Sequence, residues 1–233
     1  MSLETTLIIE TSEIAQSGDV SKKRDFDFIR PKVDYRFDLT PSLQFRTTVE
    51  KNVSQLSFND FTANTNSGDE DLNTIAGNPE LRQEQSWRYD LNLEYRFNND
   101  NGVISSNIYY HDLEDVIDRV DASTLTTIQS ASGNIGDGER YGLRLNGSLR
   151  LNFIGQPGIL VTTGLNLESS SVTDPFLGID RRLSYFSNNR QGRGSYSLGF
   201  RHDMPERDIN YGFTYRNSIR DNNKVYDINR IES

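Results

Sequence analysis

A strict alternation of apolar and polar residues in one stretch constrains the fold of this chain more than any other feature. In GNPELRQEQSWRYDLNLEYRF, residues 77–97, alternate positions of the second half are apolar or aromatic: Trp87, Tyr89, Leu91, Leu93, Tyr95 and Phe97. The positions between them are charged or polar: Arg88, Asp90, Asn92, Glu94 and Arg96. A period of two places these sets on opposite faces of a β-strand. Such a strand belongs either to a soluble sheet that covers a core or to a membrane barrel with lipid on its apolar side.

The same pattern recurs along the chain and predicts an all-β fold, because helical periodicity is nearly absent. We expect about nine amphipathic strands at residues 4–13, 31–39, 43–53, 86–98, 103–118, 139–153, 159–170, 195–202 and 209–216. One shared apolar face is expected to contain Tyr35, Phe37, Phe45, Leu91, Leu93, Leu143, Leu145, Leu198, Phe200, Phe213 and Tyr215. The opposite face is expected to carry Arg36, Arg46, Arg88 and Arg144.

The lengths of the connections indicate how these strands are arranged. Short connections are predicted at residues 40–42, 99–102, 155–158 and 203–207, and long ones at 14–28, 54–85, 119–137 and 172–193. Short and long connections therefore alternate. An antiparallel up-and-down meander with short turns on one rim and long loops on the other is typical of a large outer-membrane β-barrel. A soluble sandwich would show mixed connection lengths and Greek-key crossovers.

The composition excludes several classes of function. The net charge is −9, whereas a general nucleic-acid binder needs a basic surface to meet phosphates. The chain has no cysteine, which excludes disulfides, thiolate metal sites and cysteine nucleophiles. No run of about 18 apolar residues exists, so we predict no transmembrane helix. A transmembrane β-strand needs only about 10 residues of alternating pattern, which this chain supplies repeatedly.

Four segments carry a family resemblance. They are PKVDYRFDLTPSLQFRTTVEKNVSQLSFNDF (31–61), GNPELRQEQSWRYDLNLEYRF (77–97), NGVISSNIYYHDLEDVIDRV (101–120) and NIGDGERYGLRLNGSL (134–149). The last matches an N-x-G-x-G-x-x-x-G pattern through Asn134, Gly136, Gly138 and Gly142. Together, these segments resemble the barrel domain of TonB-dependent outer-membrane receptors. Gln83 stands where the family usually has Pro, and this difference should loosen the start of the strand slightly.

The resemblance implies a 22-stranded barrel with an N-terminal plug domain, in the outer membrane of a Gram-negative bacterium. The implied function is TonB-coupled import of a scarce solute, such as a ferric siderophore, a cobalamin or a carbohydrate, rather than enzyme catalysis. The plug, the TonB box and the last strand are not recognised within the chain. We therefore expect residues 1–233 to be one partial barrel domain, cut at both ends. This fragment is expected to contact outer-membrane lipid and to self-associate. It is expected to reach the TonB system only through the missing N-terminal part. A soluble all-β ligand-binding module without a transport role is the alternative.

The candidate ligand-binding residues are four arginines near the last long connection: Arg181, Arg182, Arg190 and Arg193. A locally basic loop steers anionic ligands such as a carboxylate-rich iron chelate, although an ordinary solvated loop has the same composition. No catalytic, cofactor or metal residues are predicted. The chain has no G-x-S-x-G elbow, and its two histidines, His111 and His202, lie on different predicted strands.

Two acidic groups are interpreted as solvated rather than as ligand sites. The first, Asp69, Glu70 and Asp71, lacks the spacing of a calcium loop. The second lies at the outer end of a predicted strand, where a hydrated rim explains Asp112, Glu114, Asp115 and Asp118.

Overall fold

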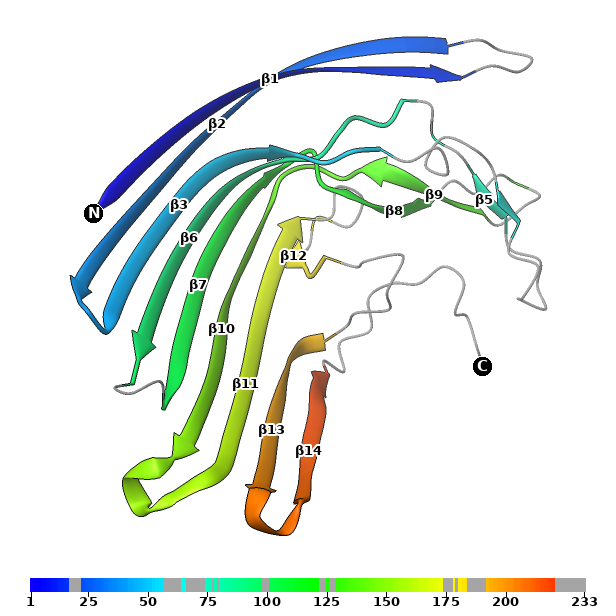
Figure 1. Cartoon of the computed structure of the whole chain (residues 1–233). Coiled ribbons are helices and arrows are strands. Elements are labelled where there is room, and N and C mark those ends of the chain that lie inside the picture. The colour runs from blue at the N-terminus through cyan, green and yellow to red at the C-terminus, as the bar shows by residue number, and fades with distance from the viewer. Residues whose placement is uncertain are drawn as a thin grey trace.

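The computed structural model describes residues 1–16, 22–56, 64–65, 74–76, 78, 80–97, 101–121, 125, 129–173, 178, 180–183 and 192–220. Its main feature is a curved sheet whose long strands pair antiparallel in chain order (Figure 1). These strands are β1 (Ser2–Gln16), β2 (Lys22–Thr40), β3 (Leu43–Val53), β6 (Gln85–Arg96), β7 (Gly102–Glu114), β10 (Gly138–Leu151), β11 (Gln156–Thr173), β13 (Gly192–Met204) and β14 (Ile209–Arg220). The short strand β12 (Asp180–Arg181) pairs with the end of β11. The predicted all-β meander is confirmed.

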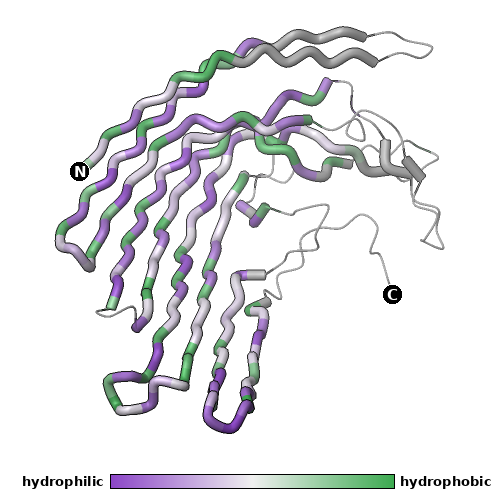
Figure 2. The backbone as a smooth tube through the Cα atoms, in the orientation of Figure 1, coloured by the Kyte–Doolittle hydropathy of each residue, from purple (hydrophilic) through white to green (hydrophobic). Residues whose placement is uncertain are grey.

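The register of the strands confirms the two predicted faces. Directly opposed residues of neighbouring strands share a face of the sheet. The register joins apolar positions into rows such as Phe37–Phe45–Leu93. It joins polar positions into rows such as Arg36–Arg46–Asn92–Asn107–Arg144. Figure 2 shows the resulting alternation of hydrophilic and hydrophobic residues along each strand.

Short turns close one edge of the sheet, as predicted. The β10–β11 turn contains the 3-10 helix η2 (Asn152–Ile154), and the β13–β14 turn contains η3 (Pro205–Arg207). Each turn ends on a left-handed residue, Gly155 with φ 75° and Asp208 with φ 53°. Glycine and aspartate tolerate this conformation, so the chain reverses direction within a few residues.

The predicted long connection at residues 14–28 is wrong. β1 and β2 continue through most of this range in regular register, with Glu13 opposite Asp25 and Gln16 opposite Lys22, so only residues 17–21 connect them. The polar composition suggested a loop. Backbone pairing uses N–H and C=O groups and does not need apolar side chains, so a strand hairpin can continue through a polar segment.

The other long connections contain a second, small sheet that the sequence did not predict. Its strands are β4 (Asn64–Thr65), β5 (Thr74–Ala76), β9 (Gln129–Asn134) and β8 (Ile117–Asp121), in that order, with β5 and β9 parallel. The strand predicted at 103–118 is divided, because Asp115 adopts φ 55° between β7 and β8. These strands are short and come from separate loops, so no single segment shows an extended alternation.

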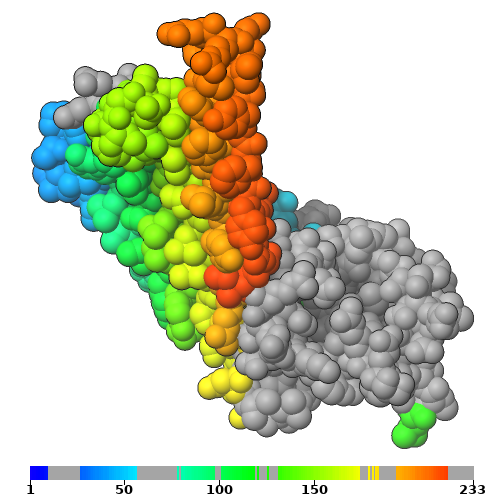
Figure 3. All heavy atoms as spheres, turned by 90° about the horizontal axis from the view of Figure 1, so that it is seen from below, coloured from blue at the N-terminus to red at the C-terminus, as the bar shows by residue number. Residues whose placement is uncertain are grey.

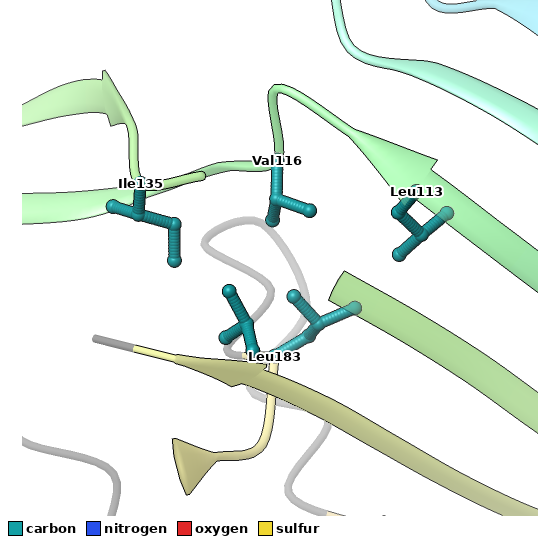
Figure 4. Packing of buried hydrophobic residues seen from close by; sticks show 5 residues of the cluster. Leu113, Val116, Ile135 and Leu183 are labelled. Atoms are coloured by element: carbon teal, nitrogen blue, oxygen red, sulfur yellow. The ribbon is translucent and has the colours of Figure 1, made fainter. Parts of the chain in front are cut away.

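A cluster of buried apolar residues lies at the loop edge of the sheet, on the side of its polar face. It contains Leu113, Val116, Ile135, Val172 and Leu183, drawn from the ends of β7 and β11 and from the adjacent loops (Figure 4). Burial of these side chains holds the adjacent loop segments against the main sheet. By contrast, the apolar face of the main sheet is open, with Ile108 50% and Phe213 60% exposed.

The two outermost strands leave open edges. Among the described residues, β1 pairs only with β2 and β14 only with β13. Figure 3 shows the β13–β14 hairpin, in orange and red, along one side of the molecule. Open strand edges and an uncovered apolar face both favour association with further polypeptide or lipid. Self-association of this chain stays a prediction. No helix in the described ranges is long and apolar enough to cross a membrane.

Candidate functional site

Asp34 and Arg46 form an ion pair on the polar face near its N-terminal strands, and Thr48 hydrogen-bonds to the same carboxylate. Arg46 on β3 donates from Nη2 and Nε to Asp34 Oδ2 on β2, at 2.7 and 2.9 Å, and Thr48 Oγ1 donates to the same oxygen at 2.9 Å. Asp34 is 9% exposed, whereas half of the Arg46 side chain is in solvent. Several charge-assisted bonds satisfy the carboxylate and hold the guanidinium across the two strands.

A network of hydrogen bonds among amide, carboxylate and guanidinium groups continues this polar surface across β6, β7 and β10. Asn107 Nδ2 donates to Asp90 Oδ1 and to Asn92 Oδ1, both at 3.0 Å. Arg144 Nη1 donates to Asn107 Oδ1 at 3.3 Å. A cavity of about 520 Å³ lies over this region and also touches Arg46. Its walls offer carboxylate, carboxamide and guanidinium groups, which can bind a polar solute or a facing polypeptide.

Tyr109 lies on the polar face, although its neighbour Tyr110 lies on the apolar one. Its hydroxyl donates to Glu168 Oε2 at 2.8 Å, and Arg140 Nη2 lies 2.6 Å from the same oxygen. The Arg144 guanidinium lies 4.5 Å from the centre of the Tyr109 ring, within cation–π range. The tyrosine is almost fully buried. It therefore joins β7, β10 and β11 through one side chain.

Gly142, the last glycine of the N-x-G-x-G-x-x-x-G pattern, makes room for Tyr109. A Cβ added at Gly142 would lie 2.5 Å from Tyr109 Cζ, closer than carbon atoms pack. Gly136, an earlier member of the pattern, has φ 107°, where side chains are strained. The sequence contained a signal for this arrangement, because Tyr109 is an aromatic residue at a position where alternation predicts a polar one.

The two most specific motifs contact each other at the loop edge. Asn134 Oδ1 accepts the Arg82 backbone N–H at 2.8 Å, and its Nδ2 donates to the backbone oxygens of Arg82 at 3.0 Å and Asp115 at 2.8 Å. Asn78 Nδ2 donates to the Ser132 backbone oxygen at 2.9 Å. Leu81 between them is fully buried. The glycine-rich pattern and the GNPELRQE segment therefore form one packed unit.

The second acidic group is only partly a hydrated rim. Asp118 is fully buried, so the predicted solvent exposure is wrong for this residue, and Asp115 forms an ion pair with Arg82 at 2.5 Å. The contact partners of this acidic group are far from it in the sequence, so the local pattern does not predict its burial.

Burial also raises the pKa of Glu84, whose Oε2 accepts the Ile117 backbone N–H at 3.1 Å. The first group, Asp69, Glu70 and Asp71, lies outside the described residues.

Two of the four candidate arginines line one groove. Arg182 Nη2 donates to Ser169 Oγ at 3.0 Å, and Arg193 is exposed where the register of β13 shifts. Both residues line a groove of about 830 Å³. Arg181 lies in β12 with its backbone opposite Val172, and Arg190 lies outside the described residues. A role of these arginines in ligand binding stays a prediction.

The family comparison matches most of the chain. The profile described as "TonB dependent receptor-like, beta-barrel" matches residues 10–175. No curated protein matches significantly.

Solved structures share the architecture. They include the alcaligin outer-membrane receptor FauA from Bordetella pertussis (12% identity, TM-score 0.59, covering 94% of this chain and 34% of that one). The FrpB iron transporter from Neisseria meningitidis, F5-1 variant apoprotein, gives 11% identity and a TM-score of 0.65, covering 92% and 30%. The copper transporter OprC gives 14% identity and a TM-score of 0.63, covering 83% and 26%. These identities show a shared fold, and the chain spans about a third or less of each of these proteins.

Proposed function

This chain belongs to the TonB-dependent receptor-like β-barrel family, and from that premise we propose that it forms part of the wall of an outer-membrane receptor that binds and imports a scarce solute. The observation that carries the proposal is the separation of the two faces. A continuous polar row runs from Arg36 to Arg144 across five strands, while apolar rows occupy the opposite face. A barrel wall with water inside and lipid outside requires this separation.

The polar face supports passage or docking of a polar solute. Its groups include both charges and several amides, held in fixed positions by pairs such as Arg46–Asp34 and Asn107–Asp90. The similar solved structures include an alcaligin receptor, an iron transporter and a copper transporter. For this protein we propose a ferric siderophore, a cobalamin or a carbohydrate, with energy supplied through the TonB system.

An uptake assay on the full-length protein tests this function. The protein is expressed in Gram-negative cells that lack their own receptors, and uptake of a radiolabelled ferric hydroxamate, a ferric catecholate, cyanocobalamin and maltohexaose is measured. We expect accumulation of one probe, and its loss in an otherwise identical strain without TonB. Accumulation that persists without TonB would contradict energised import. A protein that is monodisperse in plain buffer without detergent would favour the soluble binding module instead.

A further inference from the structure

The apolar face is not smooth but carries a groove across six strands, from β3 to β13. One wall is a register-paired row of aromatic residues, Tyr89, Tyr110 and Tyr141. The other wall is the adjacent row, Leu91, Ile108, Leu143 and Leu167. The groove has a volume of about 830 Å³, within the range of about 300–1,000 Å³ that is usual for ligand sites.

The floor of the groove is backbone. Asp90, Tyr109, Gly142 and Glu168 lie between the two rows and line the groove. Successive side chains of a strand point to opposite faces, so the side chains of these residues project to the polar face. The Tyr109–Glu168 hydrogen bond on that face agrees with this orientation. The groove therefore presents apolar walls and little charge along its length.

One end of the groove is cationic. Arg182 and Arg193 both line it, and the bond from Arg182 Nη2 to Ser169 Oγ holds that guanidinium at the end of β11. An arginine on the lipid face of a barrel is strongly destabilising at the bilayer midplane but costs little near the interface. This end is thus suited to the level of the lipid headgroups, where tyrosines also accumulate.

We propose that this groove binds a phosphate-bearing membrane lipid, with an acyl chain between the two rows and the phosphate at Arg182 and Arg193. A guanidinium binds phosphate oxygens through two parallel N–H groups, and this geometry makes arginine the preferred phosphate ligand. The inference rests on the proposed function in one respect only, namely that the apolar face meets lipid.

Acidic residues determine which end of the groove the lipid headgroup occupies. Asp112 and Glu139 are register partners on the apolar face, one row closer to the loops than Tyr110 and Tyr141. Tyr110 Oη lies 3.1 Å from Glu139 Oε2, which holds this carboxylate beside the groove wall. Their charge repels a phosphate from the β7–β10 part of the groove. The headgroup therefore lies at the β11–β13 end, beside the arginines.

Native mass spectrometry of the full-length protein in detergent tests the proposal with two probes, dioleoyl phosphatidic acid and dioleoylglycerol, which differ only in the phosphate. We expect the wild-type protein to retain phosphatidic acid more strongly. The double variant R182Q/R193Q should lose about tenfold in phosphatidic acid retention, the scale of a lost charge-assisted contact. Its retention of dioleoylglycerol should not change. Lys51→Gln, which removes another cation near the rim outside the groove lining, is the matched control.

A second pair of variants tests the acyl-chain part of the groove. Leu91→Trp fills the groove and should lower the retention of both lipids, whereas Leu198→Trp on the same face but outside the groove should leave both unchanged. Equal phosphatidic acid retention by wild type and R182Q/R193Q would overturn the proposal, as would equal losses in L91W and L198W. Such results would leave the uptake assay unaffected, so failure of the groove and failure of the transport function are distinguishable.

Discussion

Asn134 pairs with both backbone groups of Arg82, accepting its N–H at 2.8 Å and donating to its carbonyl oxygen at 3.0 Å. The two residues are 52 positions apart. One carboxamide thus replaces a strand partner for Arg82, just before β6 begins. The third bond, from Nδ2 to the Asp115 backbone oxygen, fixes the kink between β7 and β8 to the same point. The loop edge is organised around this one side chain.

Replacement of Asn134 with alanine is predicted to loosen the loop edge without unfolding the wall. The change leaves backbone groups of Arg82 and Asp115 without partners, at a local cost of about 1–3 kcal/mol. Hydrogen exchange measured by mass spectrometry on the full-length protein should be about 5- to 150-fold faster at the Arg82 amide, the factor that corresponds to this cost. Asn146→Ala, in the middle of β10, is the control. Unchanged exchange at Arg82 would contradict the role of Asn134.

Gly142→Ala is predicted to destabilise the wall. The new methyl group would meet Tyr109 and the Leu167 backbone oxygen, so the tyrosine must leave Glu168 or the strands must separate. Overpacking of this kind costs about 1–3 kcal/mol. On a denaturing gel the folded barrel migrates as a compact band, and the heating temperature at which this band disappears should be lower for the variant. In Gly147→Ala on the same strand, the new methyl group would instead meet the Thr163 side-chain methyl at 3.0 Å, and an equal fall there would contradict the explanation.

Glu84 is predicted to make the loop edge less stable as the pH rises. Burial raises its pKa above the ordinary value of 4.5, so the folded state binds the proton more tightly than the unfolded state. The stability from protonated Glu84 is complete below pH 4.5 and is lost as the pH rises through the raised pKa.

Glu84→Gln should remove this part of the pH dependence, because glutamine stays neutral. Amide exchange at Ile117, whose N–H donates to Glu84, reports the effect between pH 4.5 and 8, after correction for the intrinsic pH dependence of exchange. Glu94→Gln, on β6 near the opposite edge of the sheet, is the matched control. A corrected pH profile that is the same in E84Q and wild type would refute the prediction.

Adjacent residues of β6 are predicted to meet different solvents. The chain has no cysteine, so a single introduced thiol reports its own surroundings, in a full-length protein free of other cysteines. Asn92→Cys on the polar face should react with a water-soluble, membrane-impermeant maleimide in lipid vesicles, and Leu93→Cys on the apolar face should not. In detergent-free denaturant, both thiols should react equally. Equal labelling in vesicles would contradict a wall between water and lipid.

Much of the fold was predictable because the relevant signals are local. The alternation over Trp87–Phe97 identified β6 and its faces, and turn residues such as Gly155 and Asp208 marked the short turns. The register then aligned Arg46 with Asn92 and Asn107, as a shared polar face requires. The prediction is wrong at residues 14–28, because polar composition indicates a loop there whereas the backbone of residues 14–16 and 22–28 continues as paired strands.

Which residues face which side is evident from the alternation alone, because a period of two is a property of each strand and needs no knowledge of its neighbours. The arrangement of the loop edge, by contrast, follows only from the folded chain. There, Asp118 is buried, and segments more than fifty residues apart join Asn134 to Arg82 and assemble a second sheet. The groove on the apolar face has the same origin, since its two walls exist only where neighbouring strands pair in one particular register. Contacts of this kind join residues that are far apart in the sequence, so no periodic pattern within a single segment predicts them.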